Sequence, residues 1–207
     1  MNKNILRKGR FIVIEGADGV GSSTQCHLLV EKLKASGRSA ALTAEPSTGR
    51  IGVMAREMLR SDSGTSQDIL TLLFAADRID HYRTVIAPQL DAGIDVVCDR
   101  YLLSTYVYQS LEMPLDWIET LNVFAPMADI TLLISLPFET SWSRIQARIE
   151  SSAVKEEMFD KKELQQRIHA SYANLLNKVK GISVDGRGDP AEVSDRVMKA
   201  LLSADGS

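Results

Sequence analysis

The glycine-rich segment at residues 16–24 constrains the fold of this chain more than any other feature. It reads GADGVGSST and follows the short apolar run FIVI at 11–14 after one residue, Glu15, and helical spacing of apolar residues begins just after it. A glycine-rich turn between a buried strand and a helix lets backbone N–H groups converge on an anion, and the helix N-terminus adds a favourable dipole. The segment therefore predicts a phosphate-binding loop at the carboxyl end of a first parallel strand.

This loop departs from the usual pattern at one position. In G-x-x-x-x-G-K-[ST], Gly16 and Gly21 match the glycines, and Ser23 matches the hydroxyl that binds Mg²⁺. Ser22 stands where the pattern has a lysine that reaches the β- and γ-phosphates of ATP. Two interpretations stay open: an ATP phosphate site built mainly from backbone N–H groups, or a glycine-rich turn without a ligand. If the first holds, the phosphate-binding residues are Gly16, Ala17, Asp18, Gly19, Val20, Gly21, Ser22, Ser23 and Thr24.

Short β-branched runs alternate with segments of helical periodicity along the rest of the chain. We expect strands at 11–14, 39–43, 94–98, 130–136 and 182–184. Helices are expected at 23–35, 51–59, 102–111, 115–124, 140–150, 161–178 and 190–202, and at 67–90 either as one helix or as two with a break near Pro88. This order predicts an α/β fold: a parallel sheet of about five strands with helices on both faces.

Length and composition place the chain among ordinary single-domain proteins. Its 207 residues fit one domain spanning 1–207, and a formal net charge of −3 argues against a dedicated nucleic-acid partner. Neither Cys26 nor Cys98 has metal-site spacing, so we expect reduced core thiols. No apolar run reaches the roughly 18 residues of a membrane span, and the basic N-terminus lacks a signal-like apolar stretch, which favours a cytoplasmic protein.

Four segments in order along the chain resemble the thymidylate kinases, the dTMP kinases among the nucleoside monophosphate kinases. FIVIEGADGVG at 11–21 is similar to the family's opening, and TAEP at 43–46 resembles its T-R-E-P with Ala44 in place of arginine. LFAADRIDH at 73–81 resembles L-F-A-A-D-R-x-x-H, and DRY at 99–101 with Ser104, Tyr108 and Gln109 resembles D-R-Y-x-x-S-S-x-A-Y-Q. The resemblance implies the nucleoside monophosphate kinase fold with a P-loop at 16–24 and a short lid at about 148–160.

Phe74 and Arg78 are the candidates for reading the base of the acceptor nucleotide. They are four residues apart and so share a helix face, where a ring can stack on a base and a guanidinium can donate to a base carbonyl. The resemblance implies contacts with thymine, with the arginine at O4. The alternative is a core phenylalanine and a surface arginine paired with Asp77 or Asp80. The full set of expected dTMP-binding residues is Asp18, Pro46, Phe74, Arg78, Arg100, Ser104, Thr105 and Tyr108.

The DRY segment supplies the charged groups expected at the reaction centre. Asp99 ends a predicted strand, where a carboxylate can hold Mg²⁺ directly or through water together with Ser23. Arg100 can grip a phosphate with two parallel hydrogen bonds, and the resemblance implies that it holds the acceptor phosphate. Asp18 suits a sugar hydroxyl or a metal, and the resemblance implies the 3′-hydroxyl. Tyr108 is implied to lie near the sugar and exclude a 2′-hydroxyl, with a buried structural tyrosine as the alternative.

The lid segment is poor in arginine. Residues 151–160 are mostly acidic or neutral, and Met158 falls where the family has an arginine. Arg50, Arg144, Arg148 and Lys155 are the cations that can replace the missing lysine, and Arg144 and Arg148, four apart, can point from one helix face toward the donor. We count both as catalytic candidates with Asp18, Asp99 and Arg100, although a solvated helix face is the competing interpretation.

The motifs together predict transfer of a phosphoryl group from ATP to dTMP, giving ADP and dTDP for dTTP synthesis, with Mg²⁺ as cofactor. The resemblance also implies a homodimer. Two alternatives stay open: a catalytically weak or inactive nucleotide-binding homologue with a regulatory role, suggested by Ser22, and a kinase for another nucleoside monophosphate.

Overall fold

Five parallel strands form one central sheet in the computed structural model, which describes residues 9–59, 64–151 and 161–205. The strands are β1 (Phe11–Glu15), β2 (Ala40–Ala44), β3 (Asp95–Asp99), β4 (Ile130–Ser135) and β5 (Ile182–Asp185). They lie in the order β2-β3-β1-β4-β5, and every pairing is parallel. β1, β3 and β4 are buried almost throughout, because helices cover both of their faces. The predicted fold class is confirmed.

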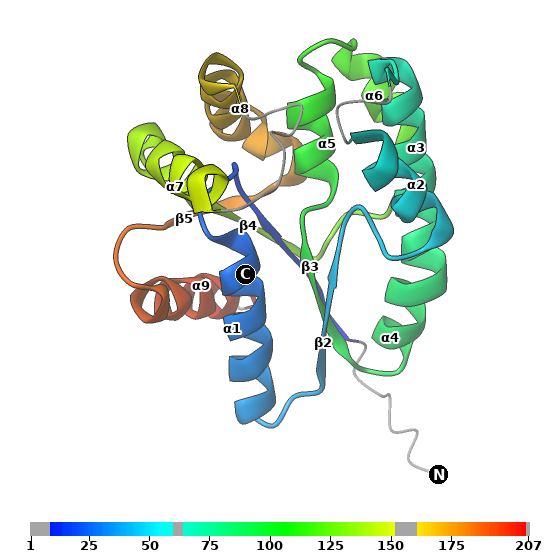
Figure 1. The fold of residues 1–207 in the computed structure, drawn as a ribbon. Coiled ribbons are helices and arrows are strands. Elements are labelled where there is room, and N and C mark those ends of the chain that lie inside the picture. The colour runs from blue at the N-terminus through cyan, green and yellow to red at the C-terminus, as the bar shows by residue number, and fades with distance from the viewer. Residues whose placement is uncertain (1–8, 60–63, 152–160, 206–207) are drawn as a thin grey trace.

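Helices form a layer on each side of the sheet (Figure 1). On one side, α1 (Ser22–Ala35) packs against β1, β2 and β3, and α9 (Pro190–Asp205) packs against β4, β5 and α1. On the other side lie α3 (Gln67–His81), α4 (Ala87–Asp91) and α5 (Leu102–Gln109). The remaining helices are α2 (Arg50–Leu59), α6 (Leu115–Leu121), α7 (Phe138–Ser151), α8 (Lys162–Leu175) and the 3₁₀ turn η2 (Leu176–Val179).

The regular α-helix expected at 67–90 is interrupted earlier in the chain than predicted. A π-helical segment, η1 (Tyr82–Ile86), separates α3 from α4, whereas the break was expected near Pro88. Pro88 has no N–H, and its ring crowds the carbonyl four residues upstream. Widening the preceding turn into a π-helix accommodates that ring, so the chain stays helical and Pro88 lies in the first turn of α4.

One hydrophobic core runs through both helix layers. Its fully buried members include Ile12 and Ile14 of β1, Leu29 of α1 and Val97 of β3. Cys26 and Cys98 are buried and unpaired, as predicted, and burial raises the pKa of both thiols. None of the helices within the described residues is long and apolar enough to cross a membrane.

Candidate active site

The glycine-rich loop and the DRY segment lie side by side because β1 and β3 are neighbours. Ile14 is in register with Asp99, so residues 16–21 leave one strand where Arg100 leaves the next. Gly19 and Gly21 have φ values of 77° and 94°, a region that favours glycine. A Cβ at Gly19 would also come within 2.4 Å of the Ser141 carbonyl oxygen. The loop therefore needs both glycines to adopt its curved backbone.

Ser23 and Asp99, the two predicted Mg²⁺ ligands, are in direct contact across the start of α1. The Ser23 hydroxyl donates to Asp99 Oδ2, while Asp99 Oδ1 is buried and has no hydrogen-bond partner within the described residues. A buried carboxylate oxygen without a partner beside a hydroxyl is the hard oxygen donor set that Mg²⁺ prefers. Across the described ranges no group of three or more His, Cys, Asp or Glu side chains could hold a metal. The two oxygens fit an ion whose other ligands are water and phosphate.

Arg100 lies at the centre of the hydrogen-bond network. Its backbone φ is 67°, which is uncommon for a residue other than glycine, and its N–H donates to the Ile14 carbonyl at 3.0 Å. Its guanidinium donates to Asp18 Oδ1 at 2.6 Å and to the Tyr172 hydroxyl at 2.8 Å. Longer bonds, both 3.3 Å, reach the hydroxyls of Ser104 and Tyr108. The network therefore presents a fixed, charged guanidinium beside the loop.

Asp18 connects the loop to this network. Burial alone would raise the pKa of Asp18, but the charge of Arg100 and hydrogen bonds from Gln165 (2.8 Å) and Tyr108 (3.1 Å) outweigh it, so the pKa is lowered. The charge of Arg148 acts in the same direction. Asp18 is therefore an ionised acceptor that faces hydroxyl and guanidinium donors, as a ligand of a sugar hydroxyl must.

A single pocket next to this network contains all eight residues expected to bind dTMP. Its walls come from the loop after β1, the segment after β2, and helices α2, α3 and α5. Four further residues line it that the sequence did not single out for this site: Glu45, Leu59, Tyr101 and Gln109. The pocket lining combines apolar and aromatic side chains with two charged pairs, Arg78 with Glu45 and Arg100 with Asp18, which suits a flat base attached to a phosphorylated sugar.

Arg78 is buried in the pocket wall and is held on several sides. Its guanidinium donates to Asn122 Oδ1 at 2.6 Å and to Thr105 Oγ1 at 2.7 Å, and it pairs with Glu45 at 2.9 Å. The alternative of a surface arginine paired with Asp77 or Asp80 is therefore wrong. Its buried Nε finds no hydrogen-bond partner among the described residues. Phe74, one turn earlier on α3, is only half-buried and lines the same pocket.

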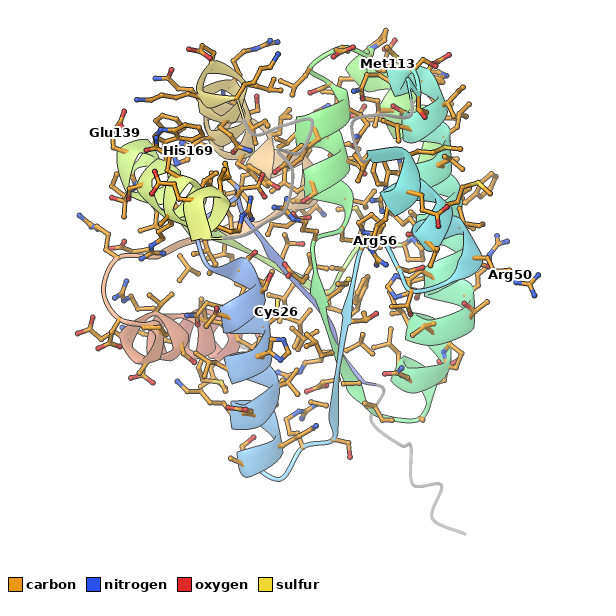
Figure 2. All side chains as sticks on the ribbon, in the orientation of Figure 1. Cys26, Arg50, Arg56, Met113, Glu139 and His169 are labelled. Carbon is orange, nitrogen blue, oxygen red and sulfur yellow. The ribbon has the colours of Figure 1, made fainter. Side chains whose placement is uncertain are left out.

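The segment after β2 closes the pocket beside Arg78. His81, at the end of α3, is buried and bonds Thr43 Oγ1 at 2.7 Å and Glu45 Oε1 at 3.1 Å. Figure 2 shows Arg56 pointing from α2 toward this segment, where its guanidinium donates to the carbonyl oxygens of Pro46 and Ser47. These contacts fix Pro46 and Glu45 at the pocket wall.

Two arginines of α7 approach the glycine-rich loop. Arg144 Nη1 donates to the Gly19 carbonyl at 3.3 Å, and Arg148 is close enough to act on Asp18 electrostatically. Arg50, the third candidate for the lysine role, points away from the molecule into solvent (Figure 2). Most of the expected lid, residues 152–160 with Lys155 and Met158, lies outside the described residues. Of the four cations considered for the lysine role, Arg144 therefore has a hydrogen bond to the loop.

Helix α8 contributes two residues that the sequence analysis did not identify. Gln165 donates to Asp18, and the Tyr172 hydroxyl bonds both Arg100 and Ser104. They are seven residues apart and therefore share a face of α8. A polar and an aromatic residue at this spacing were visible in the sequence, but nothing local indicated that this face meets the loop after β1.

Comparison with known proteins identifies the family. The family model described as thymidylate kinase matches residues 14–197. Relatives called probable thymidylate kinase are 38% identical in Pyrococcus abyssi (86% of this chain, 87% of the relative) and 35% identical in Methanococcus maripaludis (94% of each). A third, also called probable thymidylate kinase, is 39% identical in Thermococcus kodakarensis (93% of this chain, 96% of the relative). The chain therefore belongs to the thymidylate kinase family.

Proposed function

We propose that this protein transfers the γ-phosphoryl group of ATP to dTMP, giving ADP and dTDP for dTTP synthesis. The observation that carries the proposal is the pocket: it joins the base-reading candidates on α3 to Arg100 and Asp18 at the edge of a phosphate-binding loop. A base at Phe74 and Arg78 places its sugar near Asp18 and its phosphate near Arg100. That phosphate would then face the loop that cradles ATP.

The reaction needs positioning and charge neutralisation more than proton transfer. The acceptor is already an anion, so no strong general base is required. Arg100 offsets the charge of the acceptor phosphate and fixes one of its oxygens toward the donor. Asp18 would accept from the 3′-hydroxyl, and Tyr108, whose hydroxyl donates to Asp18, would exclude a 2′-hydroxyl. The backbone N–H groups of residues 16–24 hold the donor phosphates.

Ser23 and Asp99 would hold Mg²⁺ at the donor site. The ion would supply positive charge beside the donor phosphates when bound. The contact between the Ser23 hydroxyl and Asp99, and the free Oδ1 of Asp99, are the observations that support this assignment. The residues themselves keep the two oxygens at the point where β3 meets the start of α1.

Ser22 occupies the position of the usual lysine, and Arg144 is our candidate for supplying the positive charge of that lysine. Arg148 acts nearer to Asp18. The guanidinium of Arg144 lies against the loop at Gly19, and a Cβ at Gly21 would be 4.0 Å from its Nη1. A cation in this place can interact with the transferring group as the usual lysine does. Arg144 reaches the loop directly from α7.

An ADP-release assay with ATP, Mg²⁺ and a panel of monophosphates tests the function. We expect dTMP to be the best acceptor and dUMP the nearest competitor, since the missing methyl costs about 1–3 kcal/mol in an apolar pocket. dCMP, whose amino group replaces the carbonyl that faces Arg78, and dGMP should be poor acceptors. Equal turnover of all four contradicts the assignment of the acceptor. No turnover with any of them, together with intact dTMP binding by calorimetry, favours the inactive homologue.

We further propose a cytoplasmic homodimer whose protomers are single kinase domains spanning 1–207. The dimer is supported by exposed apolar side chains on two packed helices: Val53 and Met54 of α2, and Ile69 and Leu72 of α3. Exposed apolar side chains on two packed helices are typical of a contact between protein chains. The unpaired cysteines fit a reducing compartment.

A further inference from the structure

Glu15 is a fully buried carboxylate that the reaction described above does not use. It is the last residue of β1, directly before the glycine-rich loop, and its side chain has no access to solvent. Burial raises the pKa of Glu15, so the fold keeps this group against a desolvation penalty. A buried carboxylate that is not at the surface of the pocket requires a structural or functional reason.

Three donors from the acceptor side converge on this carboxylate. Oε1 accepts the backbone N–H of Tyr101 at 2.9 Å and that of Ser104 at 3.2 Å, and Oε2 accepts the Ser104 hydroxyl at 2.6 Å. Tyr101 precedes α5, and Ser104 lies in its first turn. Glu15 of β1 therefore caps the N-terminus of α5, where the side chain of the N-cap residue Tyr101 makes no capping hydrogen bond.

The chain of hydrogen bonds continues from Glu15 to Arg100. The Ser104 hydroxyl and the Tyr172 hydroxyl are 2.9 Å apart, and Arg100 Nη1 donates to that Tyr172 hydroxyl at 2.8 Å. The backbone of Arg100 is held at the same place: its own N–H bonds to Ile14, and the next N–H bonds to Glu15. A positive φ at a residue other than glycine persists only where the surroundings enforce it.

We propose that Glu15 is a positioning residue: it fixes the first turn of α5 and, through Ser104 and Tyr172, orients the Arg100 guanidinium for the acceptor phosphate. Neither Glu15 nor Tyr172 lines the pocket, so both act through Arg100. The position of Glu15, one residue before Gly16, makes the donor loop and the acceptor arginine parts of one rigid unit. This inference rests on the proposed function and adds a residue to its acceptor site.

Asp95 is a matched control for a buried carboxylate in the same sheet. Its side chain is also fully buried, but it lies at the start of β3, the end of the strand remote from Arg100. It accepts hydrogen bonds from Arg10 and Arg38 and none from the residues of the acceptor site. Asp95→Asn should therefore lower stability without changing dTMP recognition.

The test compares Glu15→Gln, Tyr172→Phe, the double variant and Asp95→Asn in the ADP-release assay, with thermal unfolding measured for each. We expect Glu15→Gln to raise the KM for dTMP about tenfold and to change the KM for ATP less than about twofold. Tyr172→Phe should shift the same constant, and the double variant should raise it by less than the product of the two single effects, since both residues act on Arg100 through Ser104 or Tyr172. Asp95→Asn should lose stability and keep the dTMP KM.

An unchanged KM for dTMP in Glu15→Gln overturns the proposal. The proposal is also overturned if the rise in this KM in the double variant equals the product of the rises in the two single variants. If Glu15→Gln does not fold, Tyr172→Phe decides: it retains the ring, and an unchanged dTMP KM overturns the proposal. A wild-type protein without dTMP-dependent ADP release contradicts the proposed function instead. Dissociation constants for dTMP, measured by calorimetry on the same variants, then decide the role of Glu15.

Discussion

Removing the Arg144 guanidinium should slow phosphoryl transfer while leaving both substrates bound. The predicted change is Arg144→Ala, which deletes the cation that contacts the glycine-rich loop at Gly19. Under the proposed function, backbone N–H groups of the loop would hold the donor phosphates with or without this side chain. The loss should therefore appear in kcat and only weakly in the KM for ATP or dTMP.

The expected size of the effect follows from the position of the guanidinium. A cation against this loop is about 5 Å from a phosphoryl group that the loop holds, and at an effective dielectric constant of about 20 it interacts with a unit charge by about 3 kcal/mol. Arg144 is exposed, so water screens part of this, and only charge that develops in the transition state counts toward the rate. About 1.4 kcal/mol remains, which is about tenfold in kcat.

The assay is ADP release under saturating ATP and dTMP, with two comparison variants. Arg83→Ala removes an exposed arginine from η1, away from the loop, and should leave kcat unchanged. Ser22→Lys, made in the Arg144→Ala background, returns a cation to the usual position and should restore part of the lost rate. A kcat of Arg144→Ala within about twofold of wild type, with Ser22→Lys alone raising the rate by orders of magnitude, would refute the reasoning. The chain would then lack a substitute for the lysine.

Three further predictions concern the acceptor site, stability and assembly. Arg100→Ala should weaken dTMP binding by about 1.5–3 kcal/mol in calorimetry and leave ATP binding intact, and unchanged affinity would make Arg100 purely structural. Asp95→Asn should cost about 2–3 kcal/mol in urea unfolding at pH 7, because Arg10 and Arg38 lose a buried partner. Burial would raise the pKa of Asp95, but those arginines hold it well below its usual range. The stabilisation that the ionised Asp95 provides is therefore complete above about pH 4 and shrinks as the pH falls further. Met54→Asp should convert a dimer to monomers in light scattering, and an unchanged mass would place the contact elsewhere.

The fold was predictable because its signals are local. The β-branched runs at 11–14 and 94–98 each become a buried strand within one residue of the expected bounds, since a covered parallel strand needs little else. The helix at 67–90 shows the limit. Pro88 predicts that the regular α-helix is interrupted nearby. The position of the interruption depends on the packing of η1, which local sequence does not encode.

The relative placement of the site residues was predictable only for residues that lie close together in the sequence. Phe74 and Arg78 share a helix turn, and Asp99 and Arg100 are adjacent, so their placement follows from secondary structure. The ion pair of Arg78 with Glu45 was not predicted, and the competing interpretation named Asp77 or Asp80 as partner instead. Glu45 reaches Arg78 from a segment 33 positions earlier, a contact that exists only because the end of β2 lies beside α3 in the folded chain.

Two carboxylates that flank the first turn of the glycine-rich loop both face the acceptor side. Glu15, before Gly16, holds the N-terminus of α5, and Asp18, after it, binds the Arg100 guanidinium at 2.6 Å. A loop that serves only ATP would gain nothing from negative charges so close to the donor phosphates, because they repel. Their cost is offset only if the same groups fix the acceptor phosphate and sugar in line with the donor. Under the proposed function, the loop at 16–24 would be the shared wall of two nucleotide sites rather than a donor site alone, and Asp18 would belong to both.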